Sequence, residues 1–158
     1  MAIKTNTATE RYCWQQGYEA GVTERQLSRF QKRDLFGFCD VFAFDPSSCV
    51  SYWLQATGND ELVEHIDKAM KEPRLVRWLQ GNGENAWGNQ TNQIRRAEIW
   101  AWNTDRDRLH CIQFVLDRDG KLRYDPAGVV MQGIDVITPY INVKKQKEQD
   151  SDTTSESK

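Results

Sequence analysis

The chain has 158 residues, of which 39% are hydrophobic and 28% are charged, and its formal net charge is −2. This length suits one domain with a sizeable core, and the near-neutral charge excludes a protein that binds nucleic acid by overall charge alone. No run approaches the roughly 18 apolar residues that span a bilayer, and residues 1–7 are too polar for a secretion signal. We therefore expect an intracellular, cytoplasmic protein without a membrane-spanning segment.

The first part of the chain predicts a helix and then a strand. Residues 8–16 suit a short helix that ends at Gly17. Residues 18–24 favour a strand, whereas the polar residues 26–32 predict either a helical turn or a loop. Four basic residues gather in this region, and we expect them to contact DNA phosphates: Arg25, Arg29, Lys32 and Arg33.

A β-hairpin follows. Residues 35–45 and 50–57 are rich in aromatic and β-branched side chains, and Asp-Pro-Ser-Ser at 45–48 is typical of a turn. A turn centred on its two serines places Asp40 directly opposite Gln55. Because side chains alternate along a strand with a period of two, the hairpin brings the two polar groups to one side.

Thr57 should join Asp40 and Gln55 on that side, because it lies two residues beyond Gln55. An aspartate among aromatic side chains is costly to bury without a partner, and a metal ion is one such partner. The other interpretation is a buried acid that backbone N–H groups or Arg33 satisfy. The sequence alone leaves both open.

The second half of the chain predicts two helical pieces and further strands. Apolar residues recur at helical spacing in residues 62–70, and again over 75–79 beyond Pro73. Residues 81–93 are nearly all amide and glycine, which predicts a long flexible loop that could dock a protein partner. Strand and edge segments are expected over 97–102, 110–116, 122–124 and 129–141.

These elements predict an α/β (α+β) fold with a single mixed β-sheet of four to five strands flanked by helices. One domain should cover residues 1–141, and the polar residues 142–158 should form a disordered tail.

Five short motifs resemble the PD-(D/E)xK nuclease superfamily, especially its small phage-associated and Holliday-junction-resolvase-like members. The matching words are Gly-Tyr at 17–18, Val-Thr-Glu-Arg at 22–25, Arg-Asp-Leu-Phe-Gly-Phe-Cys-Asp at 33–40, Gln-Ala-Thr at 55–57 and Ala-Glu-Ile-Trp-Ala-Trp at 97–102. The resemblance implies a restriction-endonuclease-like core and a DNA endonuclease or resolvase-like phosphodiesterase that uses Mg²⁺ or Mn²⁺. Small resolvase-like members often act as homodimers.

Carried over by position, Asp40 is the metal carboxylate, Gln55 fills the second acidic position and Thr57 fills the lysine position. A glutamine carbonyl can bind Mg²⁺, but threonine removes a cation that the chemistry uses. The resemblance therefore assigns Lys68, in preference to Lys71, as a substitute cation. Glu24 would supply a further metal ligand, with Glu10 as second choice.

Two other functions remain open from the sequence. One is a catalytically degenerate module that kept the nuclease fold and binds DNA or a protein partner. The other is an inhibitor or assembly factor of phage origin that uses no nucleic acid.

Overall fold

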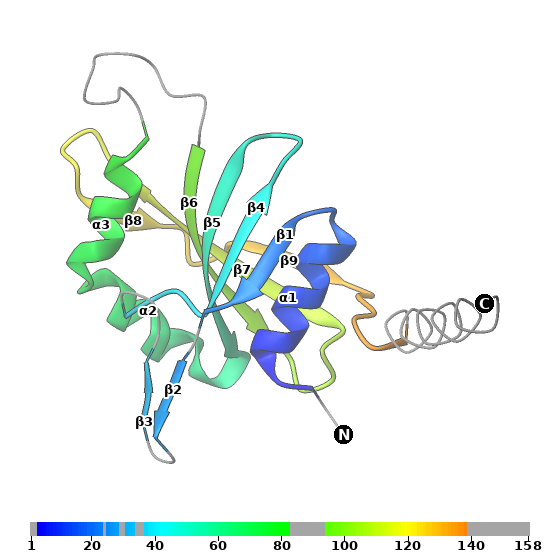
Figure 1. Ribbon diagram of the computed structural model, residues 1–158. Helices are drawn as coiled ribbons and strands as arrows, with labels where there is room; N and C mark the ends of the chain where they lie inside the picture. The colour runs from blue at the N-terminus through cyan, green and yellow to red at the C-terminus, as the bar shows by residue number, and fades with distance from the viewer. Residues whose placement is uncertain (1–2, 24, 29–30, 34–36, 83–93, 139–158) are drawn as a thin grey trace.

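The computed structural model describes residues 3–23, 25–28, 31–33, 37–82 and 94–138, with the backbone alone over 25–28 and 31–33. These residues form an α+β fold in which helices cover both faces of a central sheet (Figure 1). The helices are α1 (Thr5–Gln15), η1 (Asn59–Glu61), α2 (Leu62–Met70) and α3 (Pro73–Gln80). The strands are β1 (Glu19–Val22), β2 (Arg25–Ser28), β3 (Gln31–Arg33), β4 (Val41–Asp45), β5 (Val50–Gly58), β6 (Ile94–Trp102), β7 (Arg108–Leu116), β8 (Leu122–Tyr124) and β9 (Val129–Gln132).

The main sheet is mixed, as predicted, and has the order β1-β4-β5-β6-β7-β8, with β9 also paired to β7. Strands β1, β4 and β5 form an antiparallel meander, β5 and β6 run parallel, and β6 and β7 are again antiparallel. The parallel pair is possible because α2 and α3 lie in the connection between its strands. The sheet has seven strands in the described residues, instead of four to five, because the chain returns twice to β7.

The hairpin of β4 and β5 has the register that the sequence predicts. Val41 pairs with Leu54 and Phe42 with Trp53, so Asp40, one residue before β4, faces Gln55. The strand predicted over residues 35–45 is too long, however, because β4 begins only at Val41. Gly37 has a φ of +74°, a conformation that interrupts an extended chain and favours glycine.

Residues 26–32 were predicted as a helical turn or a loop, but the described ones, 26–28 and 31–32, belong to strands β2 and β3. Strands β2 and β3 pair with each other as a separate antiparallel sheet, which projects away from the main sheet in Figure 1. The prediction of a single sheet is therefore also wrong. The sequence of these two strands has none of the alternating apolar residues by which a half-buried strand is recognised.

Each face of the main sheet carries its own apolar core. On one face α1 packs over β4, β5 and β6, with Ala8 and Cys13 against Leu54 and Trp102. On the other face α2 and α3 cover Trp53, Ile99 and Phe114. The central strand β6 is therefore buried on both sides from Ala97 to Trp102.

The helices largely follow the sequence prediction. Helix α1 is longer than expected, because it begins at Thr5. Its Gly17 stop is confirmed by a φ of +82° just beyond the helix. Pro73 begins α3, where its missing N–H costs no hydrogen bond. Within the described part of the chain, no helix is long and apolar enough to cross a membrane.

Candidate functional site

Asp40 lies where strand β4 begins beside the longer strand β5. Its backbone still belongs to the sheet, since its N–H donates to the Leu54 carbonyl (2.9 Å) and its carbonyl accepts from the Thr23 N–H (2.7 Å). Beyond the last β4–β5 backbone pair, the Asp40 side chain provides the acceptor: its carboxylate Oδ2 accepts a hydrogen bond from the Ala56 N–H at 3.0 Å. Asp40 thus satisfies a β5 backbone donor that lies beyond the last β4–β5 pair, Val41 with Leu54.

Gln55 completes this pair. Its amide Nε2 donates to the same Oδ2 of Asp40, and both residues are at least 96% buried. The predicted convergence of Asp40 and Gln55 is therefore confirmed. Two N–H groups on one carboxylate oxygen offset much of the cost of burying its charge.

Thr57 follows on β5 and is also buried. Its hydroxyl donates to Glu61 Oε2 (3.3 Å), and the same oxygen lies 3.8 Å from His65 Nε2. The Nδ1 atom of His65 is buried and has no hydrogen-bond partner among the described residues. Thr57, Glu61 and His65 form a polar chain that the sequence prediction missed, although the four-residue spacing of each pair was its signal.

A cavity of about 580 Å³ opens at the carboxyl ends of β5 and β6, beside Thr57. Thr57, Asp60 and Glu61 line one side, and Asn103 and Arg106 line the other. Ligands of open sheets commonly bind at this end of parallel strands. Asp40 does not line this cavity, but Ala56, whose N–H donates to Asp40, and Thr57 both do.

Lys68, the predicted substitute cation, lies on the exposed side of α2. Hydrogen bonding from Arg74 is the main cause that lowers the pKa of the Glu72 carboxyl, and the Lys68 charge adds to it. Lys68 is thus a cation on the outer side of α2, between the buried positions Ile66 and Ala69.

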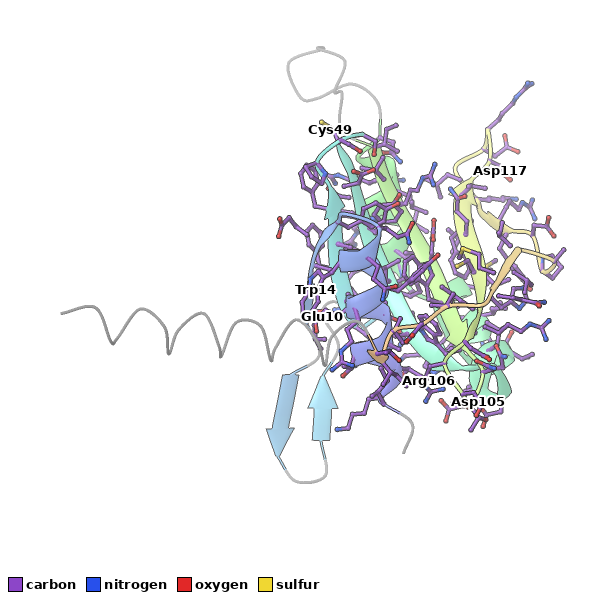
Figure 2. The ribbon with its side chains drawn as sticks, turned by 90° about the vertical axis from the view of Figure 1, so that its right-hand side faces the viewer. Glu10, Trp14, Cys49, Asp105, Arg106 and Asp117 are labelled. Atoms are coloured by element: carbon purple, nitrogen blue, oxygen red, sulfur yellow. The ribbon has the colours of Figure 1, made fainter. Side chains whose placement is uncertain are left out.

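Glu10, the second-choice acid, is held beside the β1 edge on the α1 face of the sheet, whereas the Asp40 and Gln55 side chains lie on the other face. It lies on α1 and accepts a backbone hydrogen bond from Val22, whose neighbour Thr23 bonds to the Asp40 carbonyl. Burial raises the pKa of the Glu10 carboxyl. Figure 2 shows Glu10 on α1. The first-choice acid Glu24, and the side chains of Arg25, Arg29, Lys32 and Arg33, lie outside the described residues.

Comparison of the chain with family models, curated proteins and solved structures found no match. The site must therefore be judged by its own chemistry. In the described residues no three His, Cys, Asp or Glu side chains gather closely enough to hold a metal ion. What the described residues offer is one buried carboxylate, one amide beside it, and an acidic cavity next to Thr57.

Proposed function

We propose that this protein is a divalent-metal-dependent phosphodiesterase that cuts DNA, with Asp40 at its centre. The observation that carries the proposal is the meeting of Asp40 and Gln55 where β4 leaves β5. A second support is the element order, in which a helix, an antiparallel three-strand meander, two helices and a parallel strand follow one another. This is the arrangement that a restriction-endonuclease-like core would need.

Asp40 and Gln55 would hold a Mg²⁺ or Mn²⁺ ion with oxygen atoms. In the present geometry Gln55 turns its N–H₂ to Asp40, because two oxygens would repel each other without a cation between them. Half a turn of the amide exchanges nitrogen for oxygen at no steric cost. Both residues then present oxygen, the ligand that hard cations prefer.

A bound divalent ion supplies a Lewis acid for the phosphate and lowers the pKa of its water. The protein's own residues have the supporting roles. His65 reaches Glu61 beside Thr57, where the superfamily has a lysine. His65 is therefore a candidate for the missing donor, in addition to Lys68.

The test is nicking of supercoiled DNA and cleavage of branched and single-stranded DNA in Mg²⁺ or Mn²⁺. Asp40→Asn should abolish metal-dependent cleavage and keep the fold, since asparagine still accepts from the Ala56 N–H and Gln55 can rotate to match it. Asp45→Asn is the matched control, because Asp45 is an exposed turn residue on the same strand. Cleavage by Asp40→Asn at the wild-type rate would exclude the proposal.

A second candidate function is a non-catalytic module with the same fold, which binds DNA or a protein. One observation favours it: Asp40 is buried and already accepts two hydrogen bonds, as a structural acid would. Calorimetry with Mn²⁺ distinguishes the two. A metal site gives heat that Asp40→Asn removes and Asp45→Asn keeps, whereas a structural acid gives no Asp40-dependent heat.

A further inference from the structure

A second cavity lies on the opposite face of the sheet from the Asp40–Gln55 pair. Glu98 pairs with Leu54, and Ile99 with Gln55. Because opposed residues share a face and neighbours alternate, the Glu98 side chain lies on the α1 face and that of Gln55 on the other. The cavity has a volume of about 650 Å³, within the range of small-molecule sites. It is independent of the proposed nuclease site.

The walls of this cavity are mostly uncharged, and five aromatic side chains contribute to them. These come from α1, the segment before β1, β5, β6 and β8: Tyr12, Tyr18, Tyr52, Trp100 and Tyr124. Tyr18 and Tyr52 stack at 5.4 Å between ring centroids. Burial is the main cause that raises the pKa of Tyr52 and the pKa of Cys111, so both stay neutral at neutral pH. Such walls suit a flat aromatic ligand that stacks.

The polar groups of the cavity lie together on β6 and β7. Glu98 is 8% exposed, and its Oε2 accepts a hydrogen bond from Trp100 Nε1 at 2.8 Å. Its Oε1 lies 3.9 Å from the Arg96 guanidinium, too far for a hydrogen bond. Gln113 pairs with Glu98 in the sheet and also lines the cavity. The arrangement is an acceptor with unused capacity beside side-chain donors.

This arrangement selects among planar ligands. The hydrogen-bonding edge of guanine has two adjacent N–H donors, N1–H and N2–H₂, next to the acceptor O6. Adenine and cytosine each present a single amino donor on that edge, beside ring acceptors. A carboxylate accepts two adjacent donors, and arginine donates to O6 in the commonest contact to guanine. A simple cation is disfavoured as the ligand, because the positive charges of Arg96 and Arg123, which also line the cavity, would repel it.

We propose that this cavity binds a guanine base, stacked among the tyrosine and tryptophan rings, with its N1–H and N2–H₂ on Glu98 and its O6 toward Arg96. The base could come from a free nucleotide or from an unpaired position of a nucleic-acid strand. Both sources present the same hydrogen-bonding edge of the base.

Titration calorimetry of the full chain tests this inference. The ligands are dGMP, dAMP, dCMP and deoxyinosine monophosphate, which lacks only the N2 amino group. We expect saturable binding of dGMP, with deoxyinosine monophosphate weaker by about tenfold and dAMP and dCMP weaker still. Short oligothymidylates with and without one guanine separate the two sources, because preference for the guanine strand over dGMP indicates a strand-borne base.

Glu98→Gln tests the assigned contact. Glutamine keeps the acceptor for Trp100 Nε1 but offers only one further lone pair, so dGMP affinity should fall by at least about tenfold. Asp125→Asn is the matched control, since it makes the same change at the exposed rim of the cavity. The inference is overturned if neither dGMP nor the guanine strand binds, or if Glu98→Gln binds them as the wild type does. Asp40→Asn should bind dGMP normally, so failure here is distinguishable from failure of the nuclease proposal.

Discussion

Among the described residues, each face of the sheet buries one carboxylate, and the two are stabilised differently. Asp40 lies at a strand end, where a backbone N–H and an amide both donate to it. Glu98 lies in the middle of β6, where backbone donors are already used in the ladder and one indole N–H supports it. The strand end therefore supplies donors to a charge, whereas the strand centre leaves the charge in need of a ligand.

The electrostatics of Glu98 agree with this difference. Burial raises the pKa of its carboxyl, and the Trp100 hydrogen bond and the Arg96 charge only partly oppose that effect. A ligand with two N–H donors would supply what the strand centre lacks. The comparison teaches that a buried acid is a candidate for binding when its environment leaves acceptor capacity unused.

The largest expected effect concerns the two hydrogen bonds that Asp40 accepts from Gln55 and Ala56. Asp40→Ala leaves the Gln55 amide and the Ala56 N–H without their acceptor in a buried place, and we expect a loss of about 2–4 kcal/mol in the free energy of unfolding. Asp40→Asn should lose much less, because it keeps an acceptor. Urea unfolding with an unchanged m-value measures both. Equal losses in the two variants would show that the hydrogen bonds do not carry the effect.

The second prediction concerns a variant in which the Asp40–Gln55 pair becomes a pair of acids, as in the nuclease superfamily. Gln55→Glu places two buried carboxylates together, and repulsion should lower stability by about 2 kcal/mol without metal. Mn²⁺ should restore the melting temperature if Asp40 and residue 55 converge on a cation position. The double variant Asp40→Asn with Gln55→Glu is the control and should respond less. The same Mn²⁺ response in both would argue against a shared site.

The contribution of Glu98 to the free energy of unfolding should change with pH in the opposite direction from that of most acidic residues. The folded pKa lies above the ordinary value of 4.5, so between the two values the folded state keeps a proton that the unfolded chain has released. Stability contributed by protonated Glu98 is therefore lost as the pH rises through that window. Glu98→Gln should be more stable than the wild type at neutral pH, and the difference should vanish below the unfolded pKa.

Thermal unfolding across this pH range measures the effect, with Asp125→Asn as the exposed control. A Glu98→Gln variant that is less stable at every pH would mean that the Arg96 attraction outweighs the cost of burial. That result would remove the contrast between the two carboxylates.

The meeting of Asp40 and Gln55 could be predicted from the sequence, because it depends only on nearby residues of one hairpin. The turn residues at 45–48 set the register of the hairpin, and the register alone brings Asp40 to Gln55. Lys68 could not be placed in this way. Its orientation depends on how α2 rotates over the sheet, and the buried positions Ile66 and Ala69 decide that rotation.

The Glu98 side was harder to predict. Strand β6 is buried on both faces, so its pattern of alternation does not tell an inward acid from a solvated one. The signal that could have found it is the two-residue spacing of Glu98 and Trp100, which places an indole donor on the same face as the carboxylate. The pairing of β2 with β3 was missed because their sequences carry no apolar alternation.

The smallest effect concerns the reactivity of the cysteines and distinguishes the α1 face from the hairpin turn. Cys49 is exposed, whereas Cys13 and Cys39 are fully buried. Burial raises the pKa of the Cys13 thiol to about 12 and that of Cys111 further still. Because the thiolate is the reactive form, a disulfide reagent should modify Cys49 first, and Cys49→Ser should remove the fast phase.

Cys111 then reports on the guanine cavity, since it lines that cavity and is only partly buried. Its slow modification should become slower when dGMP occupies the cavity, while the rate at Cys49, in the β4–β5 turn, should not change. Deoxyinosine monophosphate at the same concentration should protect less, in proportion to its weaker binding. Protection of Cys49 and Cys111 to the same degree would indicate a global change in stability, and the cavity would then not be the place where the nucleotide binds.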